Sequence, residues 1–415
     1  MRVCFVRELT YPVIKIDGIG PLIYKISDYL FRTENSSSCL LTRGALGVRR
    51  LDRRGNLDIC RIGLEPPRFL MQFKELEDPL RRFLFAAYSG DARFLFSSAA
   101  SPFGISAMRK LAEEAEASSL LSNVDVFHCQ GIWTNFETFI GLSLARRFQK
   151  PLIFQIQGHV GTNPECMNLD QRTPWYDPVL GWEALNQSKV IICGNKSSYE
   201  NLKLRTANKV KITFIPTCID TKVFNVGKDL EKQEKRTDLL FVARLTTFKD
   251  PITPLRAMKI VARVKPEAKL KIVGGGPLLK KIRLLVRELQ LERNVILTGV
   301  KSDTRPYYRE SKIFLAMSPV ENFLSNSLLE AMASGLVIIA TDVGETRNII
   351  RDGKNGVLVP PSDPETLASA ILSLLSDENL RHDLSRNALE TVKEYDLETV
   401  GPKYVRLYKE VMQEV

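Results

Sequence analysis

The sequence of 415 residues contains no long hydrophobic run. A helix that spans a bilayer needs about 20 consecutive apolar residues, and no stretch of the chain approaches that length. The first residues, 1–6, have the pattern of a buried strand, whereas a cleaved leader needs a longer apolar region and a cleavage site. We therefore expect a cytoplasmic protein without a membrane-spanning segment.

The chain is also poor in the residues that build metal sites and disulfide frameworks. Its seven cysteines are an odd number, lie far apart and include no Cys-x-x-Cys pair. This pattern is typical of free thiols in a reducing compartment. Only three histidines occur, His128, His159 and His382, which argues against a histidine-built metal centre. We expect neither a metal nor another cofactor.

Blocks of like charge are missing as well, although the net charge is +11. Neither a basic run nor an alternation of aromatic and basic residues indicates a nucleic-acid partner. A diffuse positive field suits anionic small molecules or peripheral contact with the cytoplasmic face of an anionic membrane, and a solvated basic surface explains it equally well. Residues 65–105 mix large apolar and basic side chains. We favour the interpretation that this segment packs on a sheet. The alternative is that it forms a surface segment in contact with a membrane.

Strand-like and helix-like segments alternate through both halves of the chain, and the length exceeds what one hydrophobic core usually organises. The expected strands are 2–6, 124–128, 151–156, 189–193, 210–215, 239–243, 269–273, 295–298, 313–317 and 337–341. The expected helices are 22–31, 136–148, 196–205, 254–264, 278–289, 327–333 and 403–413. This alternation predicts an α/β protein with parallel sheets covered on both faces. We expect domains at 1–218 and 219–395, and a terminal helical segment at 396–415.

The segment 318–335 carries the strongest functional signal. It places Glu321 in a loop and Glu330 on the helix that follows, with Ser325 or Asn326 as the N-cap. Carboxylates accept hydrogen bonds from sugar hydroxyls, and the N–H groups at a helix N-terminus suit phosphate. The pattern favours a nucleotide-sugar site.

Two cations follow the expected strand 239–243, namely Arg244 and Lys249. Ligands of open α/β sheets bind at the carboxyl ends of strands. Glycosyl transfer from a nucleotide sugar releases a diphosphate, whose growing charge must be neutralised. Arginine can do so with bidentate geometry and lysine as a point charge. Taken alone, such a pair is more often a solvated surface feature.

Glycines also follow several expected strands. Gly18 and Gly20 come after the first strand, where they permit close backbone approach to a donor phosphate or sugar. The turn around Gly275 suits phosphate, although a tight structural turn is the commoner meaning. Val300, at the end of another strand, can offer backbone groups to a nucleobase.

The order of these motifs resembles glycosyltransferase family 4, of the group 1 type. The matching features are Arg244 with Lys249, the glycine turn 274–277, the segment 318–335 and the stretches 341–344 and 352–360. The likeness is strong over 237–415 and only outlined in the first half. It implies a retaining enzyme of the GT-B fold: two Rossmann-like domains facing a central cleft, with a C-terminal helix that crosses back to the first domain.

The resemblance also assigns roles at matching positions. Arg244 and Lys249 would hold the donor diphosphate, Glu330 would accept from ribose hydroxyls, and the loop of Glu321 would contact the sugar. The residues implied for catalysis are Arg244, Lys249, Glu321 and His159. Those implied for donor binding are Gly18, Gly20, Arg244, Lys249, Gly275, Val300, Asn322, Phe323, Leu324, Ser325 and Glu330. Members of the family generally need no metal, and their acceptors are saccharides or lipid-linked sugars.

Some positions depart from the family pattern. One residue more than usual separates Glu321 from Glu330, so either Glu321 or Asn322 fills the first acidic position. Gln130 and Gln157 stand where histidines are often found. His128 lies on a buried strand and is read as a core residue, which leaves His159 as the better candidate for contact with substrate.

The sequence thus predicts a hexosyl-type glycosyltransferase that moves a sugar from a nucleotide sugar to a saccharide or lipid-linked acceptor with retention of configuration. A sugar phosphorylase, a nucleotide-sugar epimerase and a non-catalytic sugar-nucleotide-binding protein stay open as alternatives. Neither the sugar, the nucleobase nor the acceptor follows from the sequence.

Overall fold

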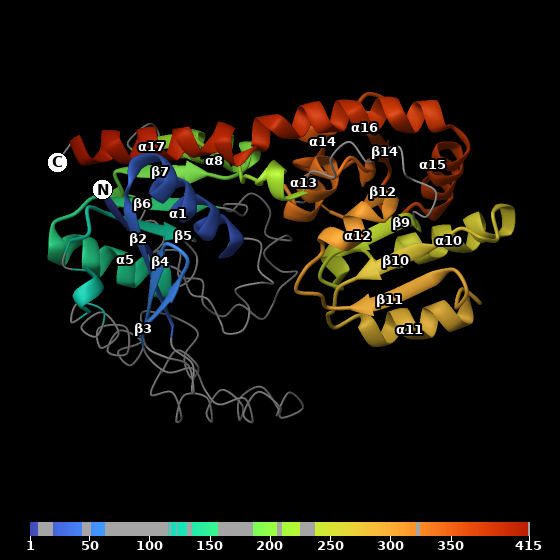
Figure 1. Cartoon of the computed structure of the whole chain (residues 1–415), viewed down its shortest axis with the longest axis horizontal. Coiled ribbons are helices and arrows are strands. Elements are labelled where there is room, and N and C mark those ends of the chain that lie inside the picture. Colours follow the sequence, from blue (N-terminus) through green and yellow to red (C-terminus); the bar gives the residue numbers. More distant parts are fainter. Residues whose placement is uncertain are drawn as a thin grey trace. The chain divides into compact units, whose positions relative to one another are not determined.

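The computed structural model divides the chain into two compact units, Met1–Pro216 with Gly401–Val415, and Thr217–Val400 (Figure 1). The first division lies two residues before the expected boundary at 218. The structure describes residues 1–6, 20–43, 51–62, 115, 118–121, 123–130, 135–156, 186–205, 210–224, 237–320 and 324–413. The segment 65–105, for which we predicted packing on a sheet or contact with a membrane, lies outside these residues.

The first unit is organised around a sheet that has eight strands in the described part of the chain. Its strands are β1 (Arg2–Val6), β2 (Ser37–Arg43), β3 (Leu51–Arg54), β4 (Leu57–Ile62), β5 (Val126–Gln130), β6 (Leu152–Ile156), β7 (Val190–Cys193) and β8 (Lys211–Phe214). Their order is β3-β4-β2-β1-β5-β6-β7-β8, and every neighbouring pair is parallel except β3 with β4. The sequence did not predict β2, β3 or β4.

Helices cover both faces of this sheet. Side chains of α5 (Asn135–Phe148) and α8 (Lys196–Arg205) share a core with Cys4, Cys39 and Cys129 on one face. Because side chains alternate along a strand, the neighbours of these cysteines point to the opposite face. On that face α17 (Leu397–Gln413) packs beside α1 (Gly20–Glu34), where a Cβ on Gly401 would lie 2.7 Å from the ring of Tyr29.

His128 is part of this second interface. Its ring is fully buried, and its Nδ1 lies 2.7 Å from the hydroxyl of Tyr408 in α17. Beside it, Gln155 Nε2 donates to the Tyr404 hydroxyl at 2.7 Å. Burial lowers the pKa of His128 to about 3, so the ring is neutral at ordinary pH. The structure therefore places His128 in the core, as the sequence suggested.

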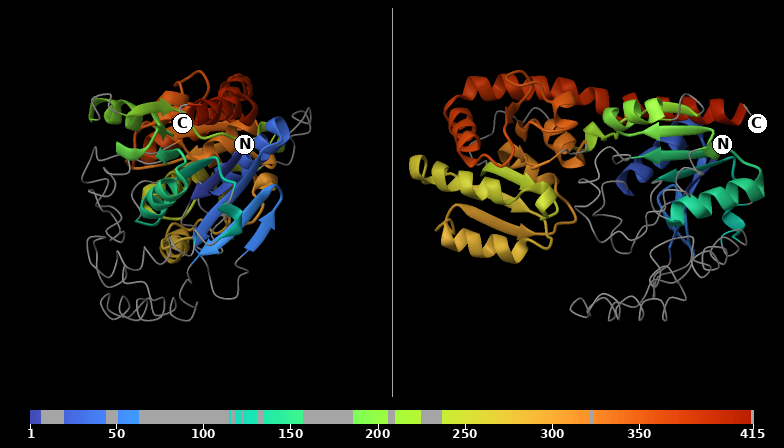
Figure 2. Two further views of the ribbon diagram at one scale, coloured as in Figure 1. Left: turned by 90° about the vertical axis from the view of Figure 1, so that its left-hand side faces the viewer. Right: turned by 180° about the vertical axis from the view of Figure 1, so that it is seen from behind.

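The second unit contains a parallel sheet, with six strands among the described residues. They are β9 (Thr237–Val242), β10 (Leu270–Val273), β11 (Val295–Gly299), β12 (Ser311–Ala316), β13 (Val337–Thr341) and β14 (Val357–Val359), in the order β11-β10-β9-β12-β13-β14. One face packs on α10 (Ile252–Val264), α11 (Leu279–Glu288) and α15 (Pro364–Ser376). Figure 2 shows α10 and α11 from behind, alongside these strands.

The other face of the second sheet packs on α12 (Arg305–Arg309), α13 (Asn326–Ala333), α14 (Thr346–Ile349) and α16 (Glu378–Val392). The short helix α9 (Thr221–Phe224) lies against α13, because the Ser334 hydroxyl just after α13 donates to the carbonyl of Phe224 at 3.1 Å. The predicted α/β class with two parallel-sheet domains is thus confirmed.

The last helix begins earlier than the sequence suggested. The sequence predicted a last helix over 403–413, whereas a 3-10 turn at Lys393–Tyr395 is followed by Asp396 and α17 runs from Leu397. Pro402 lies inside this helix, as its sixth residue. Only the first four N–H groups of a helix have no carbonyl partner, so Pro402 removes one hydrogen bond from the interior of α17. From Gly401 onward the helix belongs to the first unit.

Candidate active site at the carboxyl ends of the second sheet

The strand order of the second sheet marks one place as a ligand site. From β9 the chain moves to β10 and β11 on one side, then returns to β12 on the other side of β9. The loops after β9 and β12 therefore leave in opposite directions, and open α/β sheets bind ligands at such a switch point. Arg244 and Lys249 follow β9, and the segment leading to Glu330 follows β12.

Arg244 is exposed and Lys249 is half-buried in the 3-10 turn Thr247–Lys249. Burial and the neighbouring Arg244 charge lower the pKa of Lys249 to about 8. The turn ends at Asp250, which adopts a left-handed backbone with φ of 37°. Its carboxylate accepts from the backbone N–H of Thr253 at 3.2 Å and from the hydroxyl of that residue at 2.6 Å. This bond pair holds the turn against the start of α10, and the sequence reasoning did not identify it.

Ser318 ties the two loops together. Its hydroxyl lies 2.9 Å from the carbonyl of Phe248, which neighbours Lys249, and 2.9 Å from the carbonyl of Val320. Its backbone N–H donates to the hydroxyl of Thr341, at the end of β13, at 2.9 Å. The loop after β12 is thereby fixed to the turn that carries Lys249.

Glu330 lies half-buried on α13 and accepts a hydrogen bond from the hydroxyl of Tyr308 at 2.8 Å. Ser325 is the N-cap of α13 by position, but its side chain does not cap the helix. Instead, its hydroxyl pairs with that of Ser327 at 2.7 Å. The prediction of Ser325 as the N-cap is thus confirmed by position, although no side-chain hydrogen bond caps the helix. Tyr308 was missed, since nothing in the local sequence links it to a glutamate 22 residues away.

The glycine turn after β10 supports the loop that carries Arg244. The N–H of Leu245 donates to the carbonyl of Gly275 at 2.9 Å. A Cβ on Gly274, whose φ is +145°, would lie 1.9 Å from the carbonyl oxygen of Ala243. The close approach is thus to the protein's own backbone, which favours the reading as a structural turn. Val300 is 61% exposed beside this turn.

Several predicted site residues lie outside the described part of the chain: Gly18, His159, Glu321, Asn322 and Phe323. Gly20 is the first residue of α1. Leu324 is half-buried and packs on the core beside α13.

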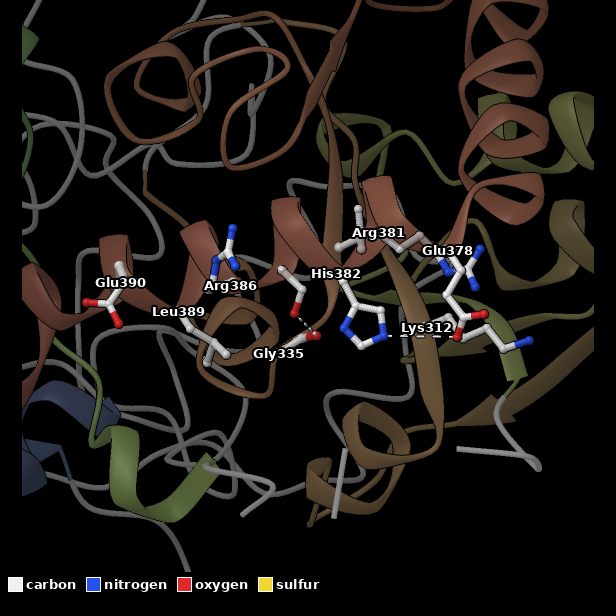
Figure 3. A pocket seen from close by; sticks show the side chains of 10 residues that line it. Lys312, Gly335, Glu378, Arg381, His382, Arg386, Leu389 and Glu390 are labelled. Carbon is white, nitrogen blue, oxygen red and sulfur yellow. Dashed lines mark hydrogen bonds and ion pairs between the residues drawn. The ribbon is translucent and has the colours of Figure 1, made fainter. Parts of the chain in front are cut away.

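The described residues include no group of three or more His, Cys, Asp or Glu side chains placed to hold a metal ion. Within the same residues, no helix combines the length and apolarity needed to cross a bilayer. A pocket of about 310 Å³ lies elsewhere, lined by Lys312, Val337 and residues of α16 such as His382 (Figure 3). Lys312 and Val337 lie at the N-terminal ends of β12 and β13. The pocket is therefore at the N-terminal ends of the strands, whereas Arg244 and Lys249 follow the C-terminal end of β9.

Known proteins resemble the chain in both sequence and fold. Residues 224–391 match the family described as glycosyl transferases group 1. An uncharacterized glycosyltransferase of Methanocaldococcus jannaschii is 27% identical over 73% of this chain and 80% of its own length. Poly(glycerol-phosphate) alpha-glucosyltransferase of Bacillus subtilis is 27% identical over 50% of this chain, but the match spans only 30% of that protein.

Among solved structures, sucrose-phosphate synthase of Thermosynechococcus elongatus aligns over 100% of both chains with a TM-score of 0.73 and 16% identity. Anabaena HepE in complex with UDP-glucose aligns over 100% of both chains with a TM-score of 0.69 and 14% identity. Identities this low establish the fold alone, which is GT-B. The sequence matches and the fold agree: residues 224–391 match the group 1 glycosyl transferases, and the chain has the fold of GT-B glycosyltransferases.

Proposed function

We propose that the protein is a retaining glycosyltransferase that moves a hexosyl unit from a nucleotide sugar to a saccharide or lipid-linked acceptor. The observation that carries this proposal is that Arg244 and Lys249 follow β9 while the segment leading to Glu330 follows β12, the two neighbouring strands at the switch point. Two cations and a carboxylate on segments that follow neighbouring strands suit a nucleoside diphosphate, whose phosphates are anionic and whose ribose donates hydrogen bonds.

In the proposed reaction, the bond between C1 of the sugar and the β-phosphate oxygen breaks. Negative charge grows on the diphosphate as it leaves, and Arg244 and Lys249 stabilise that charge. The acceptor oxygen bonds to C1 on the same face of the sugar, and its proton passes to a phosphate oxygen. Since the two cations neutralise the leaving group, the step needs no metal ion.

The donor side of the proposal has support from the relatives. HepE, which shares the fold, was crystallised with UDP-glucose, so uridine nucleotides are the first donors to test. Glu330 would accept from the ribose hydroxyls, and the loop at Glu321 or Asn322 would contact the sugar. The first domain would supply the acceptor site, with His159 as its candidate contact, in a cytoplasmic reaction that accommodates a lipid-linked acceptor at an anionic membrane.

Other activities on this fold make different products. A sugar phosphorylase would cleave a disaccharide with phosphate and no nucleotide, and an epimerase would convert the free donor. A non-catalytic member would bind the donor without turnover. Gln130, which is buried and hydrogen-bonded to Gln155 at 3.3 Å, is the feature that most favours this alternative. The cations at the switch point favour transfer over these alternatives.

The test is turnover of UDP- and GDP-sugars with a panel of saccharide and lipid-linked acceptors, followed by analysis of the anomeric configuration of the product. Arg244→Ala and Lys249→Ala should each lower kcat by about 100- to 1,000-fold, the usual effect of removing one group that stabilises transition-state charge. Arg256→Ala, which removes an exposed arginine from α10, is the matched control and should leave kcat unchanged. Full turnover in the first two variants would reject the roles assigned to them.

A further inference from the structure

Tyr308 holds the Glu330 carboxylate through its hydroxyl group. It lies on α12, is fully buried, and donates to Glu330 Oε2 at 2.8 Å. The bond joins two helices whose residues are 22 positions apart in the sequence. A hydrogen bond to a carboxylate is stronger than one between neutral groups, so it restricts the rotamers open to Glu330.

Two aromatic rings keep the Tyr308 ring in place. Phe314, on β12, has its ring centroid 5.9 Å away at an interplanar angle of 45°. Phe224, at the end of α9, lies 6.0 Å away and nearly edge-on at 78°. Edge-to-face and tilted pairs at these distances are favourable, and they fix the direction of the phenol. The hydroxyl therefore reaches Glu330 from a rigid position.

The direction of the hydrogen bond is also settled. Burial, together with the negative charge of Glu330, raises the pKa of Tyr308 well above its ordinary value. The phenol consequently keeps its proton at working pH and acts as the donor. A carboxylate has about four acceptor sites on its two oxygens, and the bond from Tyr308 occupies only one of them.

We propose that Tyr308 is a positioning residue, which aims the Glu330 carboxylate at the ribose hydroxyls of the donor nucleotide. It thereby sets how strongly the protein prefers a ribonucleotide over its 2′-deoxy counterpart. This inference rests on the proposed function, because it takes Glu330 as the ribose contact. The proposal assigns a role in the site to a residue on α12, outside the segment 318–335.

The experiment is a calorimetric titration of UDP, GDP and their 2′-deoxy counterparts into the full-length protein. We expect the wild type to prefer the ribonucleotide by about tenfold or more, the worth of one hydrogen bond to a charged group. Tyr308→Phe keeps the ring and removes only the donor, and it should shrink that preference severalfold. Tyr307→Phe is the matched control, since the neighbouring Tyr307 lies 5.5 Å from the Lys271 ammonium instead. It should leave the preference unchanged.

The outcomes separate the inference from the proposal it rests on. No nucleotide binding by the wild type would reject the proposed function. If Glu330→Ala abolishes the preference for the ribonucleotide and Tyr308→Phe retains it, only the role of Tyr308 is overturned. Equal weakening of ribo- and deoxynucleotides by Tyr308→Phe would show a purely structural effect and would also overturn it. Should Tyr308→Phe fail to fold, Phe224→Leu decides, because loosening the ring must lower the preference as well.

Discussion

Lys249 lies close enough to Arg244 to feel its charge, in a turn that also buries much of the lysine. Burial and the arginine together lower the pKa of Lys249 from 10.5 to about 8. Two cations held side by side raise the free energy of the folded protein, and an anion bound between them relieves that cost. Such strain in a pair of like charges is common at binding and catalytic sites.

The first prediction concerns pH. Lys249 loses its proton as pH rises through about 8 in the ligand-free protein, so affinity for a nucleoside diphosphate should fall above that pH. Calorimetric titrations between pH 7 and 10 measure the effect. Lys249→Arg keeps its charge over this range and serves as the control. A wild-type affinity that stays level to pH 10 would contradict the lowered pKa.

A second prediction concerns stability. A lysine whose pKa is lower in the folded state than in the unfolded state destabilises the protein fully below about pH 8, and the penalty fades between 8 and 10.5. Lys249→Met should therefore raise the free energy of unfolding at pH 7 by about 1–3 kcal/mol, while it lowers turnover. Urea unfolding at pH 7 and pH 10 checks both the gain and its loss at high pH. A variant less stable than the wild type at pH 7 would be the opposite result.

The third prediction concerns Ser318, whose hydroxyl bonds the carbonyl of Phe248. Ser318→Ala should cost about 1 kcal/mol of stability and lower kcat/KM, because the loop after β12 is released from the turn of Lys249. Ser369→Ala removes an exposed hydroxyl bond to the carbonyl of Glu365 and is the control. Equal kcat/KM in Ser318→Ala and the wild type would show that the tether has no bearing on the site.

A fourth prediction concerns the glycine turn. In Gly274→Ala the new Cβ would overlap the carbonyl of Ala243, beside Arg244, so the loop must move. We expect a loss of about 3 kcal/mol or more and weaker nucleotide binding. Gly353→Ala is the reference: this glycine has a φ of +68°, in the left-handed region, and open space around it, so the change should cost only about 1 kcal/mol. Thermal unfolding of both variants measures the difference, and an equal loss of stability in the two would contradict the clash at Gly274.

The sequence predicted the strands that are buried on both faces, because their apolar runs are continuous, as in 151–156 and 337–341. It missed β2, where Ser37, Ser38 and Thr42 interrupt the pattern, and the short hairpin of β3 and β4. The start of α17 was missed because Gly401 and Pro402 look like helix breakers. The structure explains Gly401 by contact with the ring of Tyr29, a long-range fact that local patterns do not contain.

Within the candidate site, Arg244, Lys249 and Glu330 could be selected from their places after strands and on a helix. The residues that hold these three in place could not be selected from the sequence. Tyr308, Ser318 and Asp250 act through contacts that form only when loops from separate strands meet, and each is an ordinary polar residue in its own segment. The order of the strands, which creates the switch point, is likewise a property of the folded sheet.

The most direct test is a titration of UDP and GDP into the wild type and Arg244→Ala, with Arg256→Ala as the control for loss of one surface charge. The account predicts binding of at least one nucleotide by the wild type and the control, and an affinity lower by about 100-fold in Arg244→Ala, in keeping with a charge-assisted bidentate contact to phosphate. Equal affinity in all three proteins would contradict the placement of the donor diphosphate at the carboxyl end of β9.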